Sequence, residues 1–243
     1  MELDAPLADE VRRAIRADER IHGVRGIRVD AQGREVFLEG VVEDVASKKL
    51  ALEHAGATRG VGAVIDRLRV QPSTEMSDAE IAERIQNELL DEPTLANLTL
   101  RIQASGGPVE LPHEPFPGAS GEIEVRVEHG AVTLDGEVPS LAHKRIAGVL
   151  AWWVSGVRDV VNGLGVEPPE EDSDDEIVDA LRIVFAKDRL LDSSEIQVGC
   201  RNRVVVLEGA VPTERQSHMA EFDAWCVFGV DRVDNRLRVV SRP

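Results

Sequence analysis

The chain has 243 residues, enough for two or three ordinary domains, and 42% of them are hydrophobic, which argues against a disordered protein. Only 3% are aromatic and none is tyrosine, so any core must be built from aliphatic side chains. The formal net charge of -17 disfavours nucleic-acid binding and wholesale attachment to an anionic membrane, because those surfaces are themselves negative. It is compatible with cations or with a basic partner surface.

The N-terminal segment has no basic region followed by an apolar stretch and no lipobox cysteine, so it does not resemble a secretory signal. No run approaches the ~18 apolar residues of a membrane span. We therefore expect a cytoplasmic protein, and a periplasmic one only if a leader has been removed.

A short motif recurs along the chain. Leu-x-Gly occurs at 38–40, 134–136 and 207–209; a Gly-Val pair begins 20 residues after each of these glycines, and a valine follows 30 residues after each. Such recurrence predicts tandem repeats. We expect three units, at 1–71, 76–168 and 172–243, termed domains 1, 2 and 3.

Each domain is predicted to begin with a helix whose apolar residues recur at helical spacing. These residues are Leu7, Val11 and Ile15; Ile81, Ile85 and Leu89; and Ile177, Leu181 and Phe185. Before the second and third of these helices, Ser77 with Glu80 and Ser173 with Glu176 have the spacing of a capping box.

A β-hairpin and a second helix follow in each domain. The alternating segments of the hairpins are 27–29 and 36–38, 123–127 and 131–134, and 196–198 and 204–207. Good N-cap residues for the second helices are Asp44, Ser140 and Thr213. Residues that fit the C′ position, where a left-handed conformation costs glycine little, are Gly60, Gly156 and Gly229.

Each domain closes with an alternating segment, at 64–70, 160–166 and 233–239. The predicted fold is therefore α+β: three tandem αββαβ units, each a small mixed three-stranded sheet with two helices packed on one face. The polar residue inside each last strand is Asp66, Asn162 or Asn235. Because it lies on the apolar face, we expect it to hydrogen-bond to a nearby loop backbone.

Domain 2 alone carries an insertion before its hairpin. The segment 98–102 alternates like a strand and predicts an extra strand or extended arm, followed by an inserted Pro/Gly-rich loop at about 103–121. Long loops of this kind are either functional or disordered, and both alternatives remain open.

The order α-β-β-α-β, the Leu-x-Gly after the hairpin, the Gly-Val after the second helix and the Val-x-Asn-x-Leu-x-Val strand together resemble the BON domain, a family named for osmotically inducible and nodulation-related bacterial proteins. The resemblance covers nearly the whole chain in three copies. Domain 1 departs from it with Asp66 in place of the usual asparagine. The resemblance implies a non-catalytic module that associates with phospholipid surfaces or with envelope and stress-response partners.

The residues themselves also argue against an enzyme. No nucleophile elbow, zinc-protease, P-loop or dinucleotide motif is present, and no histidine pairs with another ligand at metal spacing, so we expect no catalytic residues, no metal and no cofactor. We expect nearly all of the six histidines to lie on the surface. Cys200 and Cys226 are most simply small buried hydrophobic residues, with a disulfide or redox role as the alternative.

The remaining candidates form a possible interaction surface. They are Trp152, Trp153, Phe116, His113, Arg67, Arg69, Arg236 and Arg238. Adjacent tryptophans suggest packing or an exposed partner or membrane contact, and the arginines alternate on outward strand positions, where they could line one sheet face.

Three functions stay open at this point. The first is a phospholipid-binding module, which needs a local basic or apolar patch. The second is a cytoplasmic protein–protein interaction module, which suits the acidic surface. The third is a monovalent-cation (K⁺) sensor, since some cytoplasmic BON-containing proteins resemble potassium binders and backbone carbonyl sites leave no side-chain signature.

Overall fold

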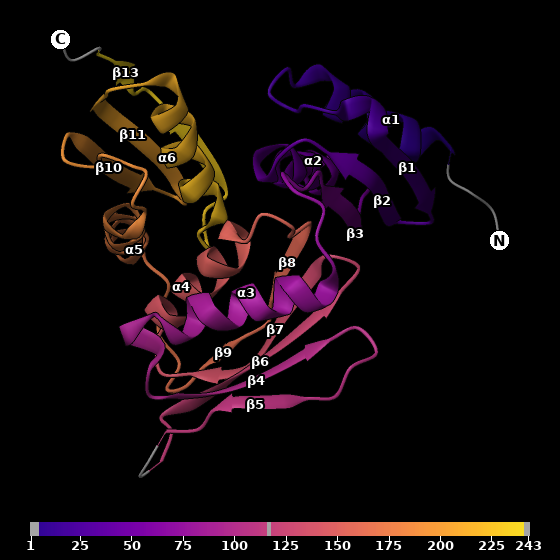
Figure 1. Cartoon of the computed structure of the whole chain (residues 1–243). Helices are drawn as coiled ribbons and strands as arrows, with labels where there is room; N and C mark the ends of the chain where they lie inside the picture. Colours follow the sequence, from indigo (N-terminus) through magenta and orange to yellow (C-terminus); the bar gives the residue numbers. More distant parts are fainter. Residues whose placement is uncertain (1–4, 116–117, 241–243) are drawn as a thin grey trace. The chain divides into compact units, whose positions relative to one another are not determined.

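The computed structural model describes residues 5–115 and 118–240. The chain divides into two compact units, Met1–Gln71 and Pro72–Pro243. The first unit is domain 1, and the second contains domains 2 and 3 (Figure 1).

Domain 1 contains α1 (Ala5–Ala17), the short 3-10 helix η1 (Val24–Gly26), β1 (Ile27–Gln32), β2 (Glu35–Val42), α2 (Val45–Ala57) and β3 (Ala63–Val70). β1 and β2 form the predicted antiparallel hairpin, and β3 pairs parallel with β2 on its other side. The crossover through α2 is what makes this last pairing parallel. Domain 1 is therefore the predicted αββαβ unit.

Domain 3 repeats this arrangement. It contains α5 (Asp174–Lys187), β10 (Ile196–Arg201), β11 (Val204–Val211), α6 (Glu214–Cys226), β12 (Arg232–Asn235) and β13 (Arg238–Val239). β12 and β13 both pair parallel with β11, so they are two parts of one interrupted closing strand.

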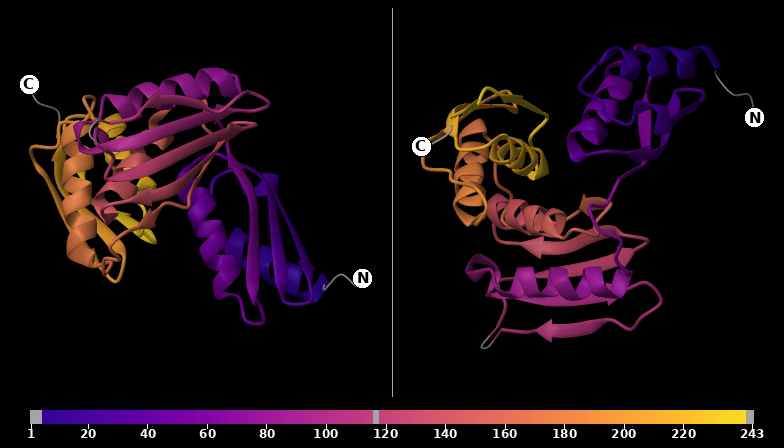
Figure 2. Two further views of the ribbon diagram at one scale, coloured as in Figure 1. Left: turned by 90° about the horizontal axis from the view of Figure 1, so that it is seen from below. Right: turned by 45° about the horizontal axis from the view of Figure 1, so that its top comes forward.

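Domain 2 has the same helices and strands as the other domains and two additional strands, β4 and β5. Its elements are α3 (Asp78–Leu90), η2 (Pro93–Leu95), β4 (Leu98–Ala104), β5 (Glu110–His113), β6 (Gly121–Glu128), β7 (Ala131–Val138), α4 (Leu141–Trp153), β8 (Asp159–Asn162) and β9 (Gly165–Val166). The sheet order is β5-β4-β6-β7-β8, with β9 also on β7. The right-hand view of Figure 2 shows β5 as the outermost strand.

The insertion is therefore more ordered than a loop. The predicted strand is confirmed as β4, but the following segment, predicted as a loop, contains β5, and the sheet of domain 2 exceeds three strands. Gly106 has φ +70°, and the amide of Gly107 donates to the carbonyl of Ala104 at 2.9 Å. This tight turn reverses the chain so that β5 pairs with β4. The positive φ at Gly106 favours glycine, because a residue with a Cβ would be strained in that conformation.

In each domain the helices cover one face of the sheet, and the strands alternate accordingly. On β7, Val132 and Leu134 are fully buried while Thr133 and Asp135 between them are half-exposed, and β2 and β11 show the same alternation. All five predicted N-caps are confirmed, including both capping boxes.

The prediction that glycine occupies C′ of the second helices is wrong. These helices end at Ala57, Trp153 and Cys226, each followed by an extended C-cap residue. Gly60 and Gly229 adopt positive φ two residues further on, and Gly156 does not. An added Cβ at Gly156 would lie 2.7 Å from Met76, so this glycine permits a close approach between segments.

Candidate functional site

The polar residue of each last strand joins the sheet to the second helix. Asn162 Nδ2 donates to the carbonyl oxygen of Lys144 in α4 at 2.7 Å, and its Oδ1 accepts from the Leu164 amide at 3.4 Å. Asn235 donates to the Ser217 carbonyl at 3.2 Å and accepts from the Leu237 amide at 3.1 Å. The predicted bond to a nearby loop backbone is confirmed by the Leu164 and Leu237 amides, and a further bond to the backbone of the second helix was not predicted.

In domain 1 the last strand is also joined to the second helix, but a different side chain is the donor. Asp66 cannot donate as asparagine does, and Lys48 from α2, with a side chain only 7% exposed, supplies the protons instead. Lys48 Nζ lies 2.8 Å from Asp66 Oδ2 and donates to the Leu68 carbonyl at 2.8 Å. The departure from the family pattern is thus matched by a buried lysine.

This compensation can be tested by a double-mutant cycle. We expect Asp66→Asn to destabilise domain 1 by about 2 kcal/mol, because the buried Lys48 ammonium loses its ion pair. Lys48→Met combined with Asp66→Asn removes both charges and leaves an asparagine that can donate to the helix backbone as Asn162 and Asn235 do, so it should recover most of the loss. Thermal unfolding by far-ultraviolet circular dichroism measures both effects, and simple additivity of the two substitutions would contradict the pairing.

The sheet face opposite the helices is lined by paired charges in each domain. In domain 2, Arg126 contacts Glu124 at 2.8 Å and Asp135 at 3.7 Å. In domain 3, Arg236 contacts Asp234 at 2.6 Å and Glu208 at 3.2 Å. We call this surface the open sheet face.

Domain 1 repeats the pattern, since Arg28 lies 3.4 Å from Asp30 and pairs with Glu39. The predicted surface arginines differ in their surroundings. Arg67 stacks 5.6 Å from the ring centroid of Phe37, and Arg69 donates to the Leu68 carbonyl at 2.9 Å. Arg238 is exposed on β13. Arg28, Arg126 and Arg236 are therefore matched by carboxylates, whereas Arg67 contacts an aromatic ring and Arg69 a carbonyl group.

Domains 2 and 3 contact each other through a buried arginine. Arg145 of α4 is 1% exposed; it donates through Nε to the Phe228 carbonyl at 3.1 Å and through Nη2 to Asp172. Asp172 also contacts Arg203 at 3.2 Å. Lys144 lies 4.1 Å above the Phe228 ring. We call these residues the Arg145 cluster.

A second contact centres on a buried carboxyl group. Asp223 of α6 is 2% exposed, and its Oδ1 accepts from Trp153 Nε1 at 2.8 Å. Its Oδ2 has no hydrogen-bond donor among the described residues. Burial, and secondarily the neighbouring carboxylate of Asp188, raise the pKa of Asp223 to about 7. Protonation would give Oδ2 a donor of its own to direct at Asp188.

The position of Asp188 is acidic in every domain but is balanced differently. In domain 1 the equivalent Asp18 is bonded by Arg20 and lies 2.8 Å from His54, and these contacts hold its pKa well below the usual range. In domain 2 the equivalent is Glu92, 2.6 Å from Lys187 of domain 3. Burial opposes ionisation of Glu92, but the bonds from Lys187 and Thr94 prevail and lower its pKa.

Sequence reasoning missed Arg145 and Asp223, although each left a signal. Asp223 occupies the repeat position of Leu150, on the apolar stripe of the second helix, where a charged residue is out of place. Arg145 borders the same stripe in α4. The acidic segment between domains 2 and 3 also contributes contacts, since Asp172 pairs with Arg145 and Glu170 accepts from the Leu141 amide at 2.8 Å.

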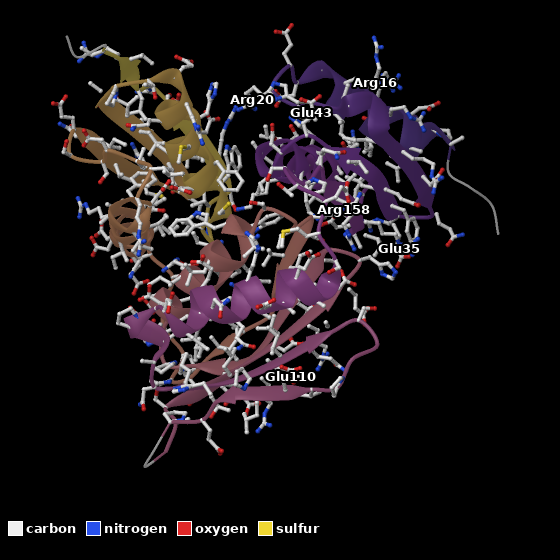
Figure 3. All side chains as sticks on the ribbon, viewed as in Figure 1. Arg16, Arg20, Glu35, Glu43, Glu110 and Arg158 are labelled. Atoms are coloured by element: carbon white, nitrogen blue, oxygen red, sulfur yellow. The ribbon has the colours of Figure 1, made fainter. Side chains whose placement is uncertain are left out.

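The other candidates of the interaction surface lie in domain 2. Trp152 and Trp153 are half-buried against its core, and Phe116 lies outside the described residues. His113 on β5 contacts the Ala96 carbonyl at 2.9 Å. It also lines a cavity of about 70 Å³, far below the volume of an ordinary small-molecule site. Glu110, labelled in Figure 3, lies on the same outermost strand.

The two cysteines are both free thiols. Cys226 is buried, and Cys200 donates to Asp174 at 3.4 Å. Burial, with the bond to Asp174, raises the pKa of Cys200 to about 12, so its thiol stays protonated at neutral pH and is a poor nucleophile.

The described residues contain neither a metal-binding cluster nor a membrane-spanning helix. In 5–115 and 118–240, no group of three or more His, Cys, Asp or Glu side chains is placed to hold a metal ion. Within the same ranges, no helix is long and apolar enough to cross a bilayer. Of the six histidines, His54, His113 and His143 are half-buried, so surface exposure describes only the others.

Comparison with known proteins agrees with the repeat geometry. The BON domain family matches residues 3–72, 115–168 and 173–241, which is most of the chain. The protein therefore belongs to the BON domain family, with three BON segments.

Individual relatives are more distant. Osmotically-inducible protein Y of Escherichia coli (strain K12) is 32% identical over 125 residues, an alignment that spans 49% of this chain and 62% of that protein. Among solved structures, the C-terminal domain of CdsD, the structural protein of the type III secretion system of Chlamydia trachomatis, is 13% identical with a TM-score of 0.25, over 98% of each chain. A likeness of that size carries no argument about fold or function.

Proposed function

We propose that this chain is a non-catalytic binding protein whose partner is another protein and not an anionic phospholipid surface. The observation that carries the proposal is the open sheet face. Its arginines Arg28, Arg126 and Arg236 each contact two carboxylates, so these three charges are already matched within the protein and are not offered to lipid headgroups. Attraction to an anionic bilayer requires unmatched Lys or Arg, each contributing about 1 kcal/mol near the surface.

Other features support a protein partner. The net charge of -17 suits a basic or neutral protein surface. Paired arginines and carboxylates on a flat sheet present polar groups that select a partner by their arrangement. The distant likeness to an osmotically-inducible protein supports a role in a bacterial stress response.

Vesicle flotation tests the lipid part directly. We expect the full chain to stay in the bottom fraction with both phosphatidylcholine vesicles and vesicles that contain phosphatidylglycerol, even at low ionic strength where surface attraction is strongest. Flotation that requires phosphatidylglycerol and is lost at high salt would show lipid binding and overturn the proposal. Replacing Glu208 and Asp234 by glutamine and asparagine provides a positive control, because it unmasks Arg236.

A further inference from the structure

The outer edge of the first hairpin strand is covered differently in each of the three domains. The first hairpin strands β1, β6 and β10 occupy equivalent positions, each antiparallel to the next strand of its sheet. β1 and β10 lie at the edges of their sheets. β6 does not, because the inserted strand β4 runs parallel along it from Leu98 to Ala104. In domain 2, therefore, β4 covers the strand edge that has no neighbouring strand within the described parts of domains 1 and 3.

The side chains along these edges are covered to different degrees. On β6, Ile123, Val125 and Val127 are at most 1% exposed, and Leu100 and Ile102, which lie beside the first two, are buried as well. On β1, Val29 and Ala31 are each 1% exposed even without a second strand. The corresponding row on β10 is only half-buried; it consists of Ile196, Val198 and Cys200.

The first helix explains the difference between domains 1 and 3. In domain 1, Arg12 of α1 reaches over the edge and donates to the Val29 carbonyl at 2.9 Å, which protects the strand from further pairing. The equivalent residue of α5, Arg182, pairs with Asp179 as Arg12 does with Asp9, but its side chain is 66% exposed and, among the described residues, bonds to no β10 carbonyl. The edge of β10 thus retains a half-buried apolar row, and its register with β11 leaves the backbone groups of Val198 and Cys200 on the outer side.

We propose that the edge of β10 binds an extended segment of a partner protein, which adds to the sheet parallel to β10 as β4 adds to β6. The proposal rests on the protein-binding function above and names its site. The partner segment should carry aliphatic side chains at every second position, as β4 does with Leu98, Leu100 and Ile102, since these occupy the space between sheet edge and first helix. Main-chain hydrogen bonds would supply affinity and the alternating side chains selectivity.

The register of β4 defines the expected complex. In domain 2, Leu100 lies opposite Ile123 and Ile102 opposite Val125. Because Ile196 and Val198 are the equivalents of those two β6 residues, a segment with the sequence of β4 should place the same two side chains beside them. The chain therefore contains its own template for the ligand, and a peptide of residues 97–105 is the natural probe.

Peptide binding to the full chain tests the site. We expect a fluorescein-labelled peptide of residues 97–105 to bind saturably in fluorescence anisotropy and to slow amide hydrogen exchange in residues 196–201. Exchange in residues 27–32 of β1, whose edge is protected, should not change. A lack of saturable binding below about 1 mM peptide would overturn the proposal.

Variants locate the binding on the molecule. Val198→Lys places a charge in the half-buried row and should weaken binding about tenfold or more, because the apolar contact is lost. Gln197→Lys adds the same charge to the opposite face of β10 and should leave binding unchanged. Circular dichroism verifies the fold of both, and a peptide with Ile102→Asp tests the contact without altering the protein.

Two results separate this site from the proposed function. Binding that survives Val198→Lys and instead alters exchange in β6 would show that the peptide displaces β4, and the β10 site would be abandoned. That result would leave the protein-binding function standing. Flotation that depends on phosphatidylglycerol would instead reject the proposed function. The peptide measurement at β10 would then still decide, independently, whether that edge binds an extended segment.

Discussion

Replacing Arg145 by methionine is expected to lower the free energy of unfolding of the unit formed by domains 2 and 3 by about 3 kcal/mol. The side chain is 1% exposed and bonded to the Phe228 carbonyl and to Asp172. Removal leaves the Phe228 carbonyl without this donor and Asp172 with its 3.2 Å contact to Arg203. Breaking one side of a buried ion pair costs more than deleting both, since the remaining charge stays desolvated.

Urea unfolding followed by tryptophan fluorescence measures this change. All three tryptophans lie in domains 2 and 3, so their emission reports on that unit and not on domain 1. Arg182→Met in α5 is the matched control, because that arginine is 66% exposed and should cost little. A loss below about 1 kcal/mol for Arg145→Met would show that the Arg145 cluster does not hold the two domains together.

Asp223 is expected to make the same unit less stable as the pH rises from about 4 to about 7. Burial and Asp188 raise the pKa of Asp223 from 3.8 to about 7, so the folded state holds a proton that the unfolded state releases. The stabilisation is complete below about pH 4 and is lost as the pH passes through about 7. Its full size is on the order of 4 kcal/mol.

Asp223→Asn should remove this pH dependence and stabilise the unit at pH 8. The asparagine oxygen can still accept from Trp153, and its amide can donate to Asp188, as protonated aspartic acid would. The measurement is the urea midpoint from pH 4.5 to 8, with Asp179→Asn, an exposed residue of α5, as the control. Parallel pH profiles for Asp223→Asn and the unsubstituted chain would contradict a buried carboxyl that titrates in this range.

The equivalent positions explain why the pKa is raised at Asp223 in domain 3 but lowered at Asp18 in domain 1. In domain 1 the carboxylate Asp18 faces His54, a group that can carry a positive charge, whereas in domain 3 Asp188 faces a second carboxyl group. Two neighbouring carboxyl groups in a buried site cannot both ionise cheaply. At this repeat position the acidic residue thus faces a histidine in domain 1 and a second carboxyl group in domain 3.

Much of the fold follows from local patterns in the chain. Alternation and helical spacing identify strands and helices because each element has one face toward the core, and those periods depend only on backbone geometry. The Ser77–Glu80 and Ser173–Glu176 capping boxes are equally local, since both partners lie within one turn. The strand at residues 110–113 could not be predicted from local patterns, because it forms only through pairing with β4.

Contacts between elements far apart in sequence were decided only in three dimensions. Arg145 is one of many charged helix residues until Asp172 and Phe228 close over it, and Asp223 gains its raised pKa from burial and Asp188. Likewise, β1 and β10 have the same pattern, yet Arg12 covers one edge and Arg182 leaves the other open. Periodicity reveals which face is buried, but exposure, pairing and proton affinity depend on what packs against that face.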